Sequence, residues 1–321
     1  MADHAIFFHD YEESDRPIIG GKCASLGAMT KAGLPVPPGF AVTTHAFADS
    51  MGRDHVGPLL HKLLDDLDVS DLHALSDAAA TCRQMVLDAG PSQEAEATIR
   101  AGYQLLCEET GIPDVAVAVR SSSTAEDMPD ASFAGQQDTY LWIRGSDHVV
   151  NHVVHCWASL YNDRAIAYRH ERGYPHAEVA MSVAVQQMVL PKAAGVAFTL
   201  NPTNGDRSTI VIDSSFGLGE PVVSGTVTPD NYMIDKVIFE ITKRTVSTKE
   251  VECCVVGDRV VERPLDADRA TSPSVTDDEI KAIARLARQA EKHFGRPQDV
   301  EWAVTIGDDG AHIVHLLQSR P

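Results

Sequence analysis

The sequence contains no long hydrophobic run. None of its 321 residues lies in a stretch approaching the roughly 20 consecutive apolar residues that a helix needs to cross a bilayer. The N-terminus, MADHAIFFHDYEESDRP, carries acidic residues where a secretory signal carries basic ones. We therefore expect a cytoplasmic protein that does not associate with membranes.

Cysteines with a metal-binding or redox spacing are also missing. No two of the six cysteines have the C-x-x-C spacing, which argues against a disulfide framework and against a zinc knuckle, so we expect reduced thiols. None of the fourteen histidines falls in a zincin pattern. A G-x-S-x-G elbow is absent as well, so a serine hydrolase is not predicted.

Positive charge is scarce. The chain has 46 acidic against 27 basic residues and a formal net charge of -19, which opposes binding to nucleic acid or to an anionic membrane. An acidic protein can still bind a polyanion if it gathers its cations, helix N-termini and divalent metal ions in one place. Positions where a cation follows glycine or precedes hydroxyl residues are therefore the candidate sites.

The first half of the chain predicts mainly helices, and no internal repeat is present. GGKCASLGAMTKAGLPVPPGFAVTT is typical of a turn, a short helix over about 24–32, and a proline-punctuated loop that leads into a strand. Apolar residues recur at three and four between about 55 and 110, as in helices of a scaffold or lid. A strand is expected to end at Arg120, and one helix is expected over about 148–171.

The second half predicts mainly strands. Apolar runs between 179 and 235 are separated by tight turns, which indicates buried strands. A helix over about 277–294 is expected to begin at Thr276, with Glu279 completing a capping box. The chain closes with QDVEWAVTI, the turn GDDG and AHIVHLLQSRP, which predicts a hairpin. One large domain or two lobes are both compatible with this length.

The closing hairpin carries polar side chains suited to a metal ion and a phosphate. If its turn centres between Asp308 and Asp309, Asp299 lies opposite Gln318 and Glu301 opposite Leu316, so Glu301, Gln318 and Arg320 project from one face. Carboxylate and amide oxygens suit Mg²⁺, which takes only one or two protein carboxylates, and an arginine fork matches a terminal phosphate. A surface ion pair on an edge strand is the alternative.

Two cations stand at positions suited to phosphate binding. Lys22 directly follows two glycines, where the backbone can approach a ligand and the ammonium can act as a point charge, although the P-loop pattern is absent. Arg120 precedes three serines and would brace the α- or γ-phosphate. A structural salt bridge from Arg120 to Glu126 or Asp127 is the alternative interpretation.

Two glycine-containing loops are candidate ligand contacts. Gly135 and Thr139 lie in a segment crowded with Ser, Thr, Asp and Gly, and would cover phosphates as a flap. Glu220 follows F-G-L-G and would be a second metal ligand or a ribose contact. G-L-G-E is too short for a dinucleotide fingerprint.

A pair of glutamines interrupts the apolar strand VAVQQMVL. Buried amides need hydrogen-bond partners, and an adenine edge would serve for Gln186, with the backbone near Gln187 and Met188 as the hinge. A water molecule or a neighbouring strand would serve equally well.

Five motifs together resemble the N-terminal nucleotide-binding domain shared by phosphoenolpyruvate synthase, pyruvate phosphate dikinase and rifampin phosphotransferase. They are GGKCASLGAMTKAGLPVPPGFAVTT, VAVRSSSTAEDMPDASFAGQQDT, AAGVAFTLNPTNGD, GLGEPVVSGTVTPD and QSRP, in this order. The resemblance covers essentially the whole chain and implies an α+β, ATP-grasp-type fold with ATP between two lobes. The N-terminal lobe would be 1–180, with the helical insert, and the C-terminal lobe 181–321.

The resemblance also implies roles for individual residues. Lys22, Arg120 and Arg320 would be catalytic phosphate ligands, with Arg320 at the γ-phosphate. Cys23 departs from the small Gly or Asn common in the family, but a thiol is also small, so ATP binding is expected to survive. The other implied ligands are Gly135 and Thr139 over the phosphates, Gln186, Gln187 and Met188 at the adenine, and Glu301 and Gln318 for Mg²⁺.

In those relatives a separate domain carries a histidine that takes phosphate from ATP and delivers it to an acceptor. The resemblance thus implies a dikinase-type, ATP-binding component that phosphorylates a histidine on a partner domain or subunit and yields AMP and phosphate. Neither the phosphohistidine domain nor the acceptor domain is expected in these residues. The chain would be a stand-alone subunit, similar to the ATP-binding subunit of phenylphosphate synthase, or one domain of a longer protein, and the acceptor would be pyruvate, a phenol or another hydroxyl compound.

Two other functions stay open. One is an ATP-sensing interaction subunit without phosphoryl transfer, against which the set of Glu301, Gln318 and Arg320 argues, since a binding module has little need of a metal pair and a γ-phosphate clamp. The other is a self-contained kinase whose small-molecule acceptor would bind between the lobes.

Overall fold

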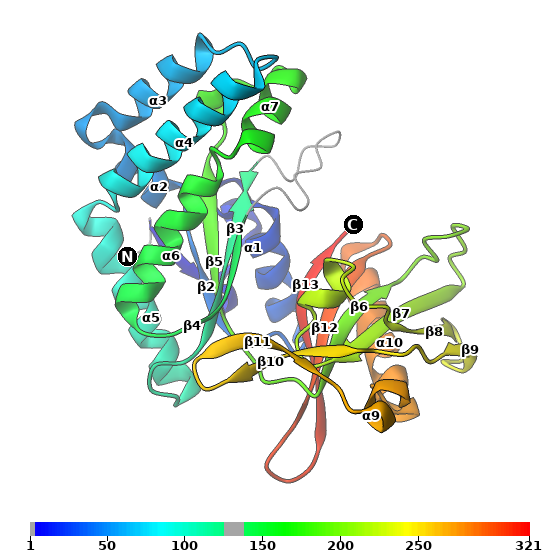
Figure 1. Cartoon of the computed structure of the whole chain (residues 1–321). Coiled ribbons are helices and arrows are strands. Elements are labelled where there is room, and N and C mark those ends of the chain that lie inside the picture. Colours follow the sequence, from blue (N-terminus) through cyan, green and yellow to red (C-terminus); the bar gives the residue numbers. More distant parts are fainter. Residues whose placement is uncertain (1–3, 125–137) are drawn as a thin grey trace. The chain divides into compact units, whose positions relative to one another are not determined.

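The computed structural model describes residues 4–124 and 138–321, which fall into two compact units (Figure 1). Unit 1 comprises the residues up to Ala28 together with Pro38–Met188. Unit 2 comprises Met29–Pro37 and Val189–Pro321. Each unit contains its own antiparallel sheet and its own helices, so the fold class is α+β.

Unit 1 is built on a five-stranded sheet in the order β1-β2-β5-β3-β4. β3 does not end at Arg120 as expected, because the three serines that follow continue to pair with β5 and are buried. The strands are β1 Ala5–Phe7, β2 Gly39–Val42, β3 Val117–Ser123, β4 Thr139–Ile143 and β5 Met181–Gln187.

Seven α-helices accompany this sheet in the described part of unit 1. The helices expected between about 55 and 110 are confirmed as α3 to α5. The single helix expected over 148–171 is wrong: it is two helices, because Asn162 between them caps α7 by accepting a hydrogen bond from the N–H of Ala165 at 2.8 Å. The helices are α1 Arg16–Lys31, α2 Thr44–Gly52, α3 Val56–Asp65, α4 Leu72–Ala89, α5 Gln93–Thr110, α6 Ser146–Ser159 and α7 Asp163–Arg172.

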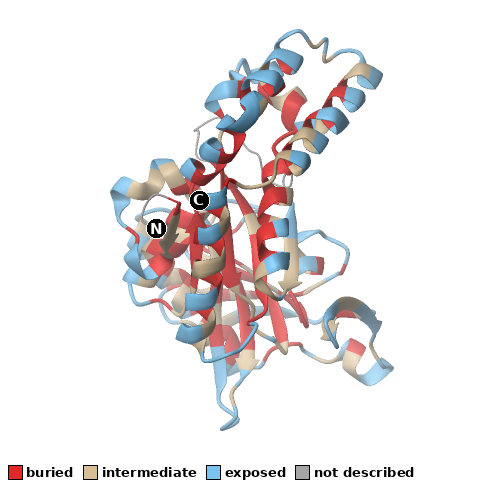
Figure 2. Ribbon diagram, turned by 90° about the vertical axis from the view of Figure 1, so that its left-hand side faces the viewer, coloured by how far each residue is buried: buried red, intermediate tan, exposed pale blue. Residues whose placement is uncertain are grey.

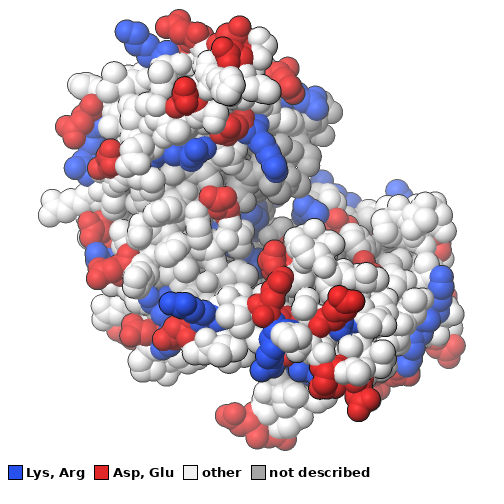
Figure 3. All heavy atoms as spheres, in the orientation of Figure 1, with Lys and Arg blue, Asp and Glu red and all other residues white. Residues whose placement is uncertain are grey.

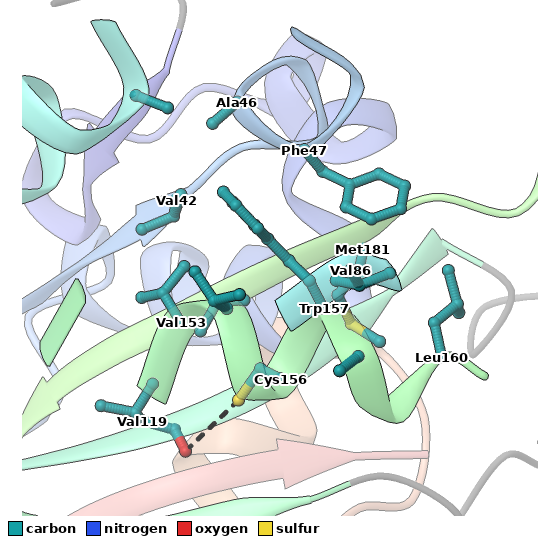
Figure 4. Packing of buried hydrophobic residues seen from close by; sticks show 14 of the residues in the cluster. Val42, Ala46, Phe47, Val86, Val119, Val153, Cys156, Trp157, Leu160 and Met181 are labelled. Carbon is teal, nitrogen blue, oxygen red and sulfur yellow. Dashed lines mark hydrogen bonds between the residues drawn. The ribbon is translucent and has the colours of Figure 1, made fainter. Parts of the chain in front are cut away.

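The core of unit 1 is centred on Trp157 of α6, which is fully buried (Figure 4). Its ring meets that of Phe47 edge to face at a centroid distance of 5.9 Å. Around them lie aliphatic side chains, including Val119 of β3 and Val183 of β5. Because side chains alternate along a strand, Arg120 and Ala184 lie on the opposite face of the sheet. The aliphatic face is therefore packed by helices, and the other face carries small and polar side chains.

Unit 2 is built on a six-stranded sheet in the order β13-β12-β6-β7-β8-β9, with a separate β10–β11 hairpin. The strands expected between 179 and 235 are confirmed as β5 of unit 1 and β6 to β8 of unit 2. The expected closing hairpin is confirmed as β12–β13. Strand interiors are largely buried (Figure 2). The strands are β6 Ala193–Phe198, β7 Thr209–Phe216, β8 Asp230–Asp235, β9 Ile241–Thr245, β10 Val251–Val256, β11 Arg259–Pro264, β12 Asp299–Ile306 and β13 His312–Arg320, and the helices are α8 Glu220–Val223, α9 Ala267–Thr271 and α10 Asp277–Phe294.

Helix α10 confirms the predicted capping box. The Thr276 side chain accepts a hydrogen bond from the N–H of Glu279 at 3.3 Å, and the Glu279 carboxylate accepts one from the N–H of Thr276 at 2.6 Å. The helix ends before Gly295, whose φ of 68° closes it. Its apolar stripe, including Ile280 and Ile283, is fully buried and packs against the sheet.

Replacing Thr276 by Ala is expected to lower the free energy of unfolding by about 1 kcal/mol, because an N–H of the first turn loses its acceptor. Urea denaturation measures this change. Thr276→Ser keeps the hydroxyl and is the matched control, which should stay close to the unmodified protein. Equal stability of the alanine variant would show that the cap contributes nothing.

The surface carries charges of both signs. On the face shown in Figure 3, acidic and basic side chains are interspersed, so the excess of acid is distributed over many positions. Within the two described ranges, no helix is both long enough and apolar enough to span a bilayer.

Candidate functional site

A sharp turn within α1 brings Lys22 to the end of β3. Gly20 interrupts the helix with a φ of 68°, a conformation that favours glycine. A Cβ at Gly20 would lie 2.7 Å from the Oγ of Ser122, so no larger residue fits here. Lys22, in the next turn of the helix, donates from Nζ to the carbonyl of Ser121. The glycine therefore allows α1 to pack closely on β3 and positions the ammonium beside the serines.

Cys23 faces the interior rather than solvent. It is fully buried, and its Sγ lies 3.7 Å from the Oγ of Ser182 on β5. Its N–H donates to the Oγ of Ser122 at 3.4 Å. The thiol is thus accommodated in the packing of α1 on the sheet, next to Lys22.

The strand register brings Arg120, Thr139 and Gln186 to one face of the unit 1 sheet. Arg120 lies directly opposite Thr139 of β4 and opposite Ala184 of β5. Gln186, which is only 2% exposed, lies diagonally across from Arg120 on the same face. The structure therefore brings together three residues that the sequence assigned to a nucleotide site.

The predicted phosphate-covering loop is described only at its ends. Gly135 lies outside the described residues, as do Glu126 and Asp127, the alternative salt-bridge partners of Arg120. The role of Gly135 therefore stays a prediction, and so do both interpretations of Arg120, as a phosphate ligand or as a salt-bridge partner.

The backbone of the predicted adenine hinge is partly engaged within unit 1. The N–H of Gln187 donates to the carbonyl of Pro38 at 2.9 Å, and the N–H of Met188 donates to the carbonyl of Ala116 at 2.8 Å. Both amide donors therefore serve the fold. An adenine at this position would depend on carbonyl groups and on the side chain of Gln186.

The β12–β13 hairpin confirms the predicted face but not the predicted pairing. Glu301 lies opposite Gln318, whereas Leu316 lies opposite Trp302. The register changes between Glu301 and Trp302, so Leu317 is an extra residue, which makes a β-bulge. The expected pairings of Asp299 with Gln318 and of Glu301 with Leu316 are wrong for two reasons: the turn is centred on Asp309, since Ile306 pairs with His312, and the bulge then shifts the register by one more residue.

The bulge separates apolar from polar side chains on β13. In a regular strand Leu316 and Gln318 would share a face, because residues two apart do so. With the extra residue, Leu316 is fully buried beside Trp302, while Gln318 and Arg320 lie on the face of Glu301. The local irregularity thus builds the candidate site and completes the core.

Asp299 belongs to this group, although the sequence predicts no role for it. It pairs with Arg320 in register, and its Oδ2 lies 3.6 Å from the Nε of Arg320. Burial raises the pKa of Asp299, and the nearby guanidinium opposes that rise. The available signal was its position two residues before Glu301, since such residues share a strand face.

Glu220 begins the short helix α8, which packs against β6 and β7. A Cβ at the preceding Gly219 would lie 3.4 Å from the Cβ of Ala194. Ala194 pairs with Ala303, which shares the face of Glu301. The exposed Glu220 therefore follows a loop that lies over the polar face of the unit 2 sheet.

Glu301 and Gln318 are the candidate metal ligands. Directly opposed side chains of antiparallel strands have Cβ atoms about 4.5–5.5 Å apart, so one ion can contact both. Among the residues that the structure describes, no group of three His, Cys, Asp or Glu side chains is arranged to hold a metal. Two oxygen donors suit Mg²⁺ bound together with phosphate, because this ion keeps several waters and needs few protein ligands.

Unit 1 carries cations beside glycine and serine residues, and unit 2 carries hard-oxygen donors beside an arginine. Both features are typical of an α+β nucleotide-binding protein. The chain belongs to the family of the pyruvate phosphate dikinase AMP/ATP-binding domain, whose family model matches residues 16–321. This is therefore an ATP-binding domain of the kind found in enzymes like phosphoenolpyruvate synthase.

Curated relatives agree with this assignment. A probable phosphoenolpyruvate synthase of Methanothermobacter thermautotrophicus is 41% identical over 321 residues, which cover 100% of this chain and 46% of that protein. The phosphoenolpyruvate synthase of Pseudomonas aeruginosa is 42% identical over 330 residues, covering 98% of this chain and 40% of that protein. That of Pyrococcus furiosus is 37% identical over 355 residues, covering 98% and 43%. The chain thus spans less than half the length of these relatives.

Proposed function

We propose that this chain is the ATP-binding, phosphate-donating component of a phosphoenolpyruvate synthase-like, dikinase-type phosphotransferase. It binds MgATP and passes a phosphoryl group to a histidine on a partner domain or subunit. Water breaks the remaining pyrophosphate linkage, so that ATP yields AMP, one transferred phosphate and one free phosphate. The acceptor after the histidine is pyruvate, a phenol or another hydroxyl compound. The observation that carries the proposal is the opposed pair of Glu301 and Gln318, with Arg320 on the same face, in a member of an AMP/ATP-binding family.

An ATP-grasp-type fold is part of the same proposal. Each unit contains an antiparallel sheet with helices, as two α+β lobes require. In unit 2, α10 packs against one face of the sheet, and the other face carries Glu301, Gln318 and Arg320. Such a two-faced sheet supports ligand binding because one face is already buried.

In unit 1 the proposed ligands contact two parts of the nucleotide, its phosphates and its adenine. Lys22 supplies a compact ammonium to phosphate oxygens, and Arg120 supplies a planar fork that suits two oxygens at once. Thr139, opposite Arg120, offers a hydroxyl to the same phosphates. Gln186 offers its amide to the adenine edge, with the carbonyls of the Gln187 and Met188 hinge as further acceptors.

In unit 2 Glu301 and Gln318 would hold Mg²⁺, which neutralises phosphate charge when bound. Arg320 would grip the γ-phosphate, and Asp299 orients its guanidinium from 3.6 Å. Glu220 would contribute a further contact from the loop before α8. Phosphoryl transfer requires mainly positioning and charge neutralisation, which these residues supply.

Calorimetric titration with ATP in the presence of Mg²⁺ should release heat, and the response should disappear when EDTA removes the metal. With γ- and β-labelled ATP and a partner that carries the phosphohistidine domain, label should leave ATP and AMP should form. Binding without any release of label would favour an ATP-sensing subunit. Turnover by the chain alone with pyruvate or a phenol would favour a self-contained kinase, and a lack of any response to MgATP would refute the proposal.

A further inference from the structure

The polar face of the unit 2 sheet extends beyond Glu301. A row of directly opposed residues crosses five neighbouring strands: Gln318, Glu301, Val196, Asp213 and Asn231. Opposed residues share a face of the sheet, so Asp213 and Asn231 project to the same side as Glu301. On the other side, which packs against α10, Ile212 and Tyr232 are fully buried.

Asp213 and Asn231 form a hydrogen-bonded pair. The Nδ2 of Asn231 donates to the Oδ1 of Asp213 at 2.7 Å. Both side chains are partly exposed, whereas their chain neighbours Ile212 and Tyr232 are buried. Burial raises the pKa of Asp213, and the amide of Asn231 opposes that rise. Among the described residues no lysine or arginine balances this carboxylate, so the fold alone does not account for an acid in the middle of β7.

The spacing along the row restricts what Asp213 can bind. Val196 stands between Glu301 and Asp213, so the backbone positions that carry the two carboxylates are two strand spacings, or about 9–10 Å, apart. With a strand between them and Asp213 hydrogen-bonded to Asn231 on the far side, the two carboxylates are not arranged to share one metal ion. An anion would be repelled by the carboxylate. A neutral group with hydroxyl donors fits best, because Asp213 and Asn231 both offer oxygen acceptors.

A nucleoside triphosphate carries such a group at a comparable distance from its terminal phosphates, namely the ribose diol beyond the α-phosphate. We propose that Asp213, oriented by Asn231, accepts hydrogen bonds from the ribose hydroxyls and makes the site selective for ribonucleotides. This rests on the proposed function, since it places the metal-bound phosphates at Glu301. Val196 lies between the two polar groups and provides an apolar surface for the sugar ring.

The test compares ATP with 2′-deoxy-ATP and 3′-deoxy-ATP by calorimetry, each with Mg²⁺, on the full chain. The unmodified protein should bind ATP about 10- to 100-fold more tightly than at least one deoxy analogue, because a hydrogen bond to a charged acceptor is lost. Asp213→Ala should bind ATP as weakly as that analogue and show little preference. Asp213→Asn, which keeps an oxygen acceptor without the charge, should fall between them.

Two controls separate ribose recognition from a general effect. Glu240→Gln removes one negative charge from the turn between β8 and β9 and should keep the preference for ATP. Magnesium tripolyphosphate lacks a sugar and should bind the unmodified protein and Asp213→Ala equally. Thermal unfolding of Asp213→Ala checks that the variant is folded. Asn231→Ala keeps the carboxylate of Asp213 but removes the hydrogen bond that orients it, so this variant should show a smaller preference for ATP.

The outcomes distinguish the two proposals. If the unmodified protein binds ATP and both deoxy analogues equally, ribose recognition by Asp213 is wrong while MgATP binding stands. If folded Asp213→Ala binds ATP, deoxy-ATP and tripolyphosphate more weakly by the same factor, ribose recognition is also refuted, because the residue would then act on the whole site. If neither ATP nor tripolyphosphate binds the unmodified protein, the proposed function itself fails.

Discussion

Glu301→Ala and Arg320→Ala are each expected to slow phosphoryl transfer by about 100- to 1,000-fold, as when one preorganised charge-stabilising group is removed from an active site. Glu301 would be lost as a magnesium ligand, and Arg320 as the group that grips the γ-phosphate. Both side chains are partly exposed, with Arg320 at 54%, so the free energy of unfolding should change by no more than about 0.5 kcal/mol.

The measurement is the initial rate of AMP formation with a phosphohistidine-domain partner, alongside urea denaturation of each variant. Glu262→Ala and Arg259→Ala are matched controls, because they remove the same side chains from exposed positions on β11. These controls should leave the rate unchanged. Parallel losses of stability and activity in the Glu301 and Arg320 variants would show that the hairpin pair is structural.

Arg320→Lys tests whether geometry matters in addition to charge. Lysine keeps the positive charge but lacks the planar fork that binds two phosphate oxygens. Its rate should therefore lie between those of the unmodified protein and Arg320→Ala. A rate equal to that of the unmodified protein would show that a point charge is sufficient.

Elements with strong local signals were predictable from the sequence. The capping box of Thr276 and Glu279 defines the start of α10 through bonds between neighbouring residues, and alternating or continuous apolar runs define β5 to β8. The hairpin followed from its turn residues. Such signals are contained within a few residues, so no knowledge of the rest of the fold is needed.

Features that depend on distant partners were not predictable. The bulge at Leu317 exists because Leu316 packs beside Trp302 while Gln318 faces Glu301, and that conflict arises only once the strands are paired. The pairing of Arg120 with Thr139 likewise crosses a segment of the chain whose length fixes no register.

Asp213 was missed for the same reason. In the sequence it is one acid in the apolar run STIVIDSSF, far from the closing hairpin. It joins the row of Glu301 only because β6 lies between β12 and β7 in the sheet. Strand order is a property of the whole unit. The sequence therefore shows an acid within an apolar strand but does not show which residues lie beside it.

A fully buried ion pair stabilises unit 2 close to the loop before α8. Lys249 and Asp230 are both 0% exposed, and the Lys249 Nζ lies 2.6 Å from the Oδ1 of Asp230. The carboxylate also accepts hydrogen bonds from Ser274, through its N–H at 2.8 Å and its Oγ at 2.7 Å, and from the N–H of Ser247 at 3.0 Å. Lys249 has fewer partners: it donates to the carbonyl of Ser247 and lies 5.6 Å from the ring centroid of Phe216.

This asymmetry predicts unequal effects of removing each partner. Asp230→Asn should lower the free energy of unfolding by about 3–5 kcal/mol, because it leaves a buried ammonium without a counter-charge. Lys249→Met should cost less than Asp230→Asn, because the remaining carboxylate keeps its donors from Ser247, Ser274 and the Tyr232 hydroxyl, the last at 3.4 Å. Urea denaturation of both variants and of the double variant gives the coupling. The double variant should lose less than the sum of the single losses, since it contains no unpaired buried charge, and strictly additive losses would show that the two side chains contribute through packing and not through their pairing.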